Sequence, residues 1–355
     1  MLGFTRARRR ALAVAATATA AVLTLGGCSS SGGDKDDKTA KADKGAEQKS
    51  GGAFPVSIKS ALGTAEIPAE PKRIITLGQG SAETAIALGT TPVGIESYAW
   101  GSDKTGYLPW IHEAVTQSGE KLPKQFTGGE ELDTEAILEL DPDLILAPWS
   151  GVTQKQFDIL NDIAPTVAYP DLPWSTNWDE QIQVIAKAMG KPEQAPKLIG
   201  TIEKQLADAA KTRPDYANHT FSYIYNTGPG TLGVFKPDEQ RVTMLSSLGL
   251  KVDPVVDTFK ETKGTDSALI GLENAEKLKN SDLLFTFYTD AKNKKEVEAQ
   301  PLYASMPAVK KGAVVSSADT SFVTASSIIN PLTVPWTIDR YLPLIDKAVA
   351  AAGRK

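Results

Sequence analysis

The chain of 355 residues contains one cysteine, Cys28, whose position suggests chemistry at its thiol. A short apolar run, residues 11–25, comes just before it, and four arginines precede that run. The run is too short to cross a bilayer comfortably as a permanent helix, and the whole stretch is typical of a signal peptide. A thiol directly behind such a run is a candidate for acylation, and we expect no structural role for it.

Gly26 and Gly27 give this thiol the small neighbours of a lipoprotein processing site. They resemble the residues before the cysteine that the lipoprotein signal peptidase recognises. We therefore expect a signal peptide over residues 1–27 and lipid on Cys28, which would anchor the chain to the outer face of the cell membrane. An ordinary secretory signal with a chance cysteine is the alternative, and Arg9 with Arg10 leaves twin-arginine as well as Sec export open.

Other residues suited to chemistry are scarce. His112 and His219, the two histidines, are over a hundred residues apart, without Cys or Glu at metal-ligand spacing. The sequence lacks a Gly-x-Ser-x-Gly elbow, a credible His-based triad and a redox thiol. We therefore expect no protein-built metal site, no cofactor and no enzymatic activity.

Charge narrows the choice of partner. The formal net charge is −5, and loss of the four arginines in residues 1–27 moves it to about −9. An acidic surface of this kind argues against nucleic acid as a partner.

The elements that must position any site begin at Phe54. Residues 29–53 have no large apolar side chain, so we expect a flexible tether over residues 28–53. Strand and helix patterns then alternate, which is typical of an α/β protein. Strands are predicted at 73–77, 92–95, 143–147 and 166–169, helices at 81–88 and 133–140, and a long aromatic-rich loop at 97–129.

A helical pattern at 192–213 divides the body in two. The pattern carries an apolar stripe that includes Leu198, Ile202 and Leu206, and its about 22 residues would span roughly 33 Å, long enough to join two lobes. The alternation then resumes, with strands predicted at 220–225, 283–287 and 314–315 and helices at 242–248, 274–279 and 333–351. We predict two Rossmann-like α/β lobes joined by one long rigid helix: an N-terminal lobe at 54–190, the helix at 191–213 and a C-terminal lobe at 214–355.

Several segments together resemble one known family, the bacterial substrate-binding lipoproteins that serve ABC importers for iron–siderophore complexes and cobalamin. The segments that carry the resemblance are 71–78, 81–83, 92–95, 135–138, 141–146 and 160–167. The resemblance implies a monomeric, bilobed receptor whose lobe angle changes little on loading. It also implies docking to the permease through one acidic side chain on each lobe, which here would be Glu135 and Glu273.

Both glutamates are predicted in the first turn of a helix, where a carboxylate complements the helix dipole. The alternative is that they only stabilise those helices.

A ligand between such lobes would contact the loops at the carboxyl ends of the strands. The candidate ligand-binding residues there are Tyr98, Trp100, Tyr107, Trp110, Trp149, Trp174, Tyr225, Phe235, Arg241, Tyr288 and Arg340. For each tryptophan the alternative is a ring that plugs its loop onto the core. Arg241, our preferred donor to the ligand, could instead form a surface ion pair with Glu239 or Asp238.

Charge then discriminates among siderophores. Ferric tricatecholates are trianions and would need several converging cations, yet residues 97–110 and 149–178 contain only Lys104 and Lys155. We therefore expect a ferric hydroxamate, possibly a ferrioxamine, whose iron arrives wrapped in its chelator. Cobalamin is an alternative ligand for the same fold, and a surface siderophore-processing enzyme is a less favoured function.

Overall fold

The structure is a computed structural model that describes residues 53–226, 228, 230–263 and 265–353. The predicted signal peptide, Cys28 and the tether up to residue 52 lie outside the described residues. Within the described part of the chain, no helix combines the length and apolar character that crossing a membrane requires.

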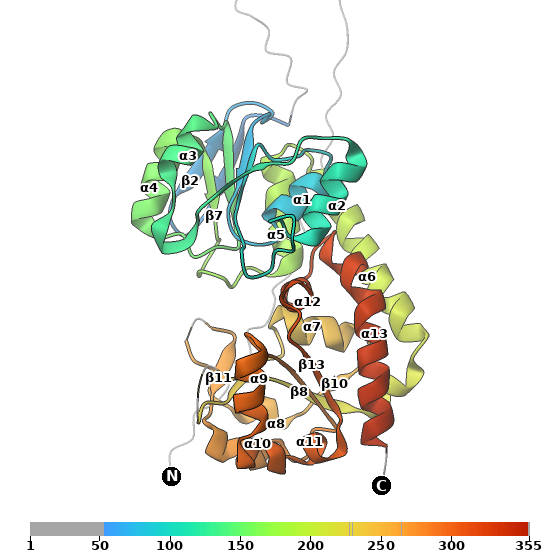
Figure 1. Ribbon diagram of the computed structural model, residues 1–355. Helices are drawn as coiled ribbons and strands as arrows, with labels where there is room; N and C mark the ends of the chain where they lie inside the picture. The colour runs from blue at the N-terminus through green and yellow to red at the C-terminus, as the bar shows by residue number, and fades with distance from the viewer. Residues whose placement is uncertain (1–52, 227, 229, 264, 354–355) are drawn as a thin grey trace, which may run out of the picture. The chain divides into compact units, whose positions relative to one another are not determined.

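A five-stranded parallel sheet forms the centre of the first lobe (Figure 1), in the order β5, β4, β3, β6, β7. Its strands are β3 (Ile74–Thr76), β4 (Gly94–Glu96), β5 (Lys124–Phe126), β6 (Leu144–Ala147) and β7 (Thr166–Ala168). The helices around it are α1 (Ser81–Ala87), α2 (Pro109–Ser118), α3 (Thr134–Glu139), α4 (Gln154–Ile163) and α5 (Trp178–Ala188). Strands β3, β6 and β7 are short, buried and almost wholly apolar, as parallel strands covered on both faces are. A hairpin of β1 (Val56–Lys59) and β2 (Thr64–Ile67) precedes the sheet.

The predicted long loop at 97–129 is wrong in its second half, because α2 and β5 lie within it. Pro109 occupies the first helical position, where its missing N–H costs nothing. Trp110, Ile111 and Val115 form the buried face of α2.

The second lobe has a mixed sheet in the order β11, β9, β8, β12, β13, with β10 beside β8. Its strands are β8 (Thr220–Tyr225), β9 (Gly233–Phe235), β10 (Lys251–Val252), β11 (Ser267–Leu269), β12 (Leu283–Phe287) and β13 (Val314–Ser317). Strand β9 pairs antiparallel with both β8 and β11, and the other described pairs of this sheet are parallel. The helices are α7 (Gln240–Ser247), α8 (Val255–Thr258), α9 (Ala291–Glu298), α10 (Pro301–Ser305), α11 (Pro307–Lys311) and α12 (Thr320–Ala325). The helix predicted at 274–279 is present as a 3₁₀ helix, η4 (Leu272–Leu278).

Helix α6 (Ala195–Lys211) connects the lobes, with a 3₁₀ turn, η2 (Pro192–Gln194), before it. The C-terminal helix α13 (Thr333–Ala352) packs along α6 (Figure 1). Near the start of α13, Trp336 meets Trp110 of the first lobe edge to face at 5.4 Å. One cluster of buried apolar residues continues from β1 through α6 to α13. The predicted fold class, two Rossmann-like α/β lobes joined by a long helix, is confirmed, and α13 reinforces the connection.

Candidate functional site

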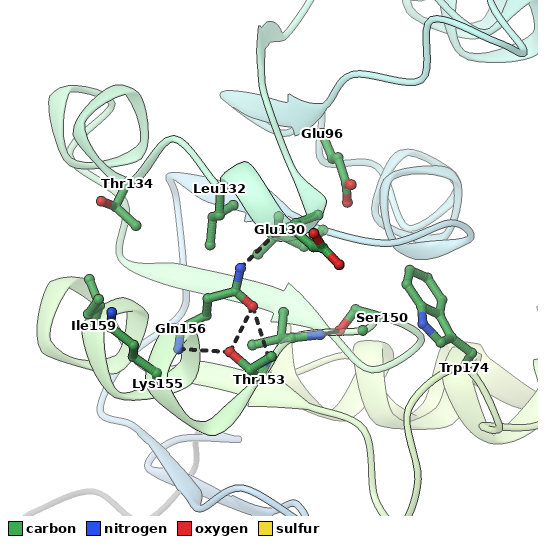
Figure 2. Close-up of a pocket in the computed structure, with 14 residues that line it drawn as sticks. Glu96, Glu130, Leu132, Thr134, Ser150, Thr153, Lys155, Gln156, Ile159 and Trp174 are labelled. Carbon is green, nitrogen blue, oxygen red and sulfur yellow. Dashed lines mark hydrogen bonds between the residues drawn. The ribbon is translucent and has the colours of Figure 1, made fainter. Parts of the chain in front are cut away.

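Two cavities meet at one residue, Trp174. The larger, of about 550 Å³, lies in the first lobe, and Trp174 forms part of its wall (Figure 2). The smaller, of about 130 Å³, has walls from both lobes, with Trp149 and Trp174 from the first and Phe235 and Arg241 from the second. We call them the first-lobe cavity and the inter-lobe cavity.

The first-lobe cavity lies at the carboxyl edge of the parallel sheet. Glu96 is the last residue of β4, Leu77 follows β3, and Ser150 lies just beyond β6. Strand ends that diverge at this edge leave space that loops must enclose, which is the usual location of ligand sites in α/β folds. The cavity volume falls within the range typical of small-molecule sites, about 300–1,000 Å³.

Trp174 has the properties of a ligand platform. Its side chain is 44% exposed, and its backbone adopts a left-handed φ of 61°, a conformation that costs a non-glycine residue about 1–2 kcal/mol. Its indole meets the ring of Trp149 edge to face at 4.8 Å. It also covers Gly151, where an added Cβ would lie 2.7 Å from the indole. The fold therefore holds a large apolar ring against solvent in a strained position.

Arg241 is held rigidly at the second-lobe wall. Its backbone N–H donates to Glu239 Oε2 at 2.8 Å, and its guanidinium donates to Glu239 Oε1. The guanidinium lies over the Phe235 ring at 4.7 Å. Burial raises the pKa of Glu239, although the neighbouring Arg241 opposes this shift. The structure thus pairs Arg241 with Glu239, one of the two partners considered above, and both residues line the inter-lobe cavity. The guanidinium has further N–H groups that could donate to a ligand.

Glu96 brings an acidic group into the first-lobe cavity. Its Oε2 accepts from the Gly78 N–H at 2.8 Å and from the Tyr98 hydroxyl at 3.1 Å. Burial raises the pKa of this carboxyl above its ordinary value. Figure 2 shows the carboxyl groups of Glu96 and Glu130 directed into the cavity.

The aromatic residues between β4 and α2 lie outside both cavities. We call residues 97–108 the clasp loop, because this segment of the first lobe binds the second lobe. Ser321 Oγ donates to the Gly101 carbonyl at 2.9 Å, and the Trp100 Nε1 donates to the Thr289 carbonyl at 3.4 Å. The aromatic rings expected here as ligand contacts, Tyr98, Trp100, Tyr107 and Trp110, line neither cavity among their described wall residues.

Within that group, the polar atoms have partners in the protein. Trp110 is 3% exposed, and its Nε1 donates to the buried Glu83 carboxylate at 2.8 Å. The Tyr107 hydroxyl donates to the Pro123 carbonyl at 2.8 Å. These hydrogen bonds agree with the alternative given for the tryptophans, in which the ring packs its loop onto the protein.

The other residues predicted to contact the ligand, Tyr225, Tyr288 and Arg340, line neither cavity among the described wall residues. Tyr225 stacks on Phe235 at 4.8 Å, so it supports the wall of the inter-lobe cavity. Tyr288 is 1% exposed and hydrogen-bonded to Glu298, which removes it from the proposed contact set. Arg340 lies on the exposed side of α13, over the Trp336 ring at 3.7 Å, and lines neither cavity.

Both candidate docking residues are exposed on the surface. Glu135 lies in the first turn of α3. The N-cap of this helix is Asp133, whose side chain accepts a hydrogen bond from the Ala136 N–H at 3.0 Å. Glu273 lies in the first turn of η4 and accepts from the Asn274 side chain at 3.0 Å. Their role in docking stays a prediction.

Acidic wall residues are what the sequence reasoning missed. The described walls of the two cavities contain five carboxylates and two cations, Lys155 and Arg241; the carboxylates are those of Glu96, Glu130, Asp238, Glu239 and Asp266. Glu96 could have been found as a charged residue that ends a buried parallel strand. No described group of three or more His, Cys, Asp or Glu side chains could hold a metal ion.

The sequence model of periplasmic binding proteins matches residues 74–319. The chain belongs to the periplasmic binding protein family. Within it, the chain is 31% identical to the probable siderophore-binding lipoprotein YfiY of Bacillus subtilis, over 77% of this chain and 83% of that protein. It is 25% identical to the ferric enterobactin-binding periplasmic protein FepB of Escherichia coli O6:H1, over 76% of this chain and 86% of that protein.

A solved structure of this periplasmic binding protein type supports the same assignment. PiaA of Streptococcus pneumoniae TIGR4, in complex with ferrichrome, is 28% identical and superposes with a TM-score of 0.75. The match covers 83% of this chain and 99% of that one.

Proposed function

We propose that this chain captures a ferric hydroxamate siderophore, such as a ferrioxamine, outside the cytoplasm and delivers it to an ABC importer. Its family and its relatives support a siderophore as the ligand. Those relatives include a protein named for ferric enterobactin and another crystallised with ferrichrome. The choice between catecholate and hydroxamate therefore depends on the chemistry of this chain's own cavities.

The charge of the cavity walls favours a hydroxamate. The described walls contain five carboxylates and two cations, and one of the two cations, Arg241, is already paired with Glu239. A ferric tricatecholate is a trianion. Its binding would cost desolvation of the trianion and would place it beside carboxylates of the same charge. The iron centre of a ferric trihydroxamate is neutral, so such a complex is neutral or weakly cationic and needs only a few donors and apolar walls.

The walls offer those contacts to a neutral complex. Trp149, Trp174 and Phe235 present rings against which methylene chains can pack. Arg241 is placed to donate to hydroxamate oxygens. The iron would arrive already chelated, so the protein would supply binding and no metal ligand, cofactor or catalysis.

Titration tests the ligand class. Quenching of tryptophan fluorescence should report saturable binding of ferrioxamine, with ferric enterobactin and cobalamin binding at least about a hundredfold more weakly. Arg241→Lys keeps the charge but loses the planar fork, so it should weaken hydroxamate binding about tenfold. Tight binding of ferric enterobactin or of cobalamin, with no response to the hydroxamate, would overturn the proposal.

Delivery is a separate part of the proposal. We expect a monomer anchored through lipid on Cys28 and docked to the permease through Glu135 and Glu273. In cells, Glu135→Ala with Glu273→Ala should reduce siderophore uptake strongly, while the purified variant keeps its affinity. Normal uptake by the double variant would remove the docking role and leave the ligand assignment standing.

A further inference from the structure

We propose that Glu96 makes the first-lobe cavity selective for a ferric hydroxamate that carries a protonated amine, by accepting a hydrogen bond from that amine. The inference rests on the proposed function and deepens it, because it distinguishes cationic hydroxamates from neutral ones.

The position of Glu96 supports this role. The carboxylate is fixed through Oε2 by the Gly78 N–H and the Tyr98 hydroxyl, so binding a cation needs little reordering of the side chain. The backbone of Gly128 passes close to it, and an added Cβ there would lie 2.2 Å from Glu96 Oε1. A glycine at 128 thus lets the carboxylate occupy this place in the cavity wall.

Glu96 also lacks a cationic partner. None of the ion pairs between described residues includes it, and the described cation in the same cavity wall is Lys155. Figure 2 shows Lys155 beside Ile159, well away from Glu96. A partly buried carboxylate without a counter-charge is costly, and a cation from the ligand would relieve that cost.

The rest of the cavity fits an alkylammonium group better than a metal ion. Trp174 exposes its indole in the same wall, and an aromatic face attracts a nearby ammonium group. Leu77, Leu132 and Val152 supply apolar surface for the attached carbon chain. A bare metal ion would instead require several ligands, and no described group of three acidic, His or Cys residues provides them.

A matched pair of ligands tests the inference. Ferrioxamine B has a terminal amine, and its N-acetyl derivative has the same iron centre and chain without the charge. The wild-type protein should bind the free amine about tenfold to a hundredfold more tightly, as expected for a hydrogen bond between charged groups. Glu96→Gln should abolish this preference by weakening the free amine alone, and unchanged binding of the acetylated ligand would show that the variant site is intact.

Glu131→Gln serves as the control, since this carboxylate is exposed, screened by water and absent from the described walls of both cavities, and it should change the preference less than about threefold. Equal binding of both ligands by the wild type would overturn the inference. Equal weakening of both ligands by Glu96→Gln would do so too. Absence of binding to either ligand would instead overturn the proposed hydroxamate function.

Discussion

Two aromatic-rich regions of the first lobe look alike in sequence and differ in the structure. The clasp loop and the adjoining Trp110 have their polar groups bonded inside the protein, and they join the lobes. Further along the chain, Trp149 and Trp174 instead present their rings to the cavities, with Trp174 in a left-handed backbone conformation. Aromatic content thus marks both loops as special, but the partners of each ring decide whether it serves the fold or the ligand.

The largest contrast should appear in stability. Trp110→Ala removes a buried ring and the hydrogen bond that its Nε1 donates to Glu83 Oε1, so the free energy of unfolding should fall by about 3–5 kcal/mol. Trp174→Ala loses mainly the contact with Trp149 and should cost less than about 1.5 kcal/mol. Urea unfolding of the two variants measures this difference, and equal losses would contradict the division between the regions.

Binding should show the opposite order. Trp100 and Trp174 are 45% and 44% exposed, which makes them a matched pair. Trp174→Ala should weaken binding of the ferric hydroxamate about tenfold to a hundredfold, because the ring lines both cavities. Trp100→Ala should change it less than about threefold. Isothermal titration gives both values, and a larger loss for Trp100 would reverse the assignment.

The clasp loop can be tested through Gly101. A Cβ at this position would lie 2.5 Å from Thr324 Oγ1 of the second lobe, so Gly101→Ala should push the lobes apart and cost about 1–3 kcal/mol of stability. Spin labels at Lys121→Cys and Lys310→Cys, in a Cys28→Ser background, should show a longer or broader distance distribution.

Gly200→Ala is the control for this experiment, because an added Cβ there meets open space. An unchanged distribution in Gly101→Ala would mean that the clasp loop does not set the lobe angle.

The smallest expected effect concerns pH. Burial raises the pKa of Glu96, so folding favours its neutral form. The associated stability is complete below the ordinary value of about 4.5 and is lost as the pH rises through the higher pKa of the folded state. Relative to Glu96→Gln, the wild type should therefore be less stable at pH 7 than at pH 4. Urea unfolding at both values checks this, and a difference between the two proteins that is independent of pH would contradict it.

The sequence was a good guide to the sheets and a poor guide to the direction of side chains. Strands β8 and β12 begin and end where the sequence predicted, because both are largely apolar segments that the sheet buries. Arg241, Trp149 and Trp174 were placed in the site through the rule that ligands bind at the carboxyl ends of strands.

Trp110 and Tyr288 could not be assigned in the same way. Their roles depend on partners distant in the chain, such as Glu83 for Trp110 and Tyr303 for Tyr288. Glu96 was missed for a similar reason, since a single acidic residue at a strand end acquires meaning only when the cavity around it is known.

Diffraction at the iron absorption edge, from crystals grown with a ferric hydroxamate, tests the central claim most directly. The anomalous peak of the iron should lie between Trp174 and Arg241, where the two lobes share a cavity wall. A peak beside the clasp loop, or crystals that contain no iron at saturating ligand, would contradict the account.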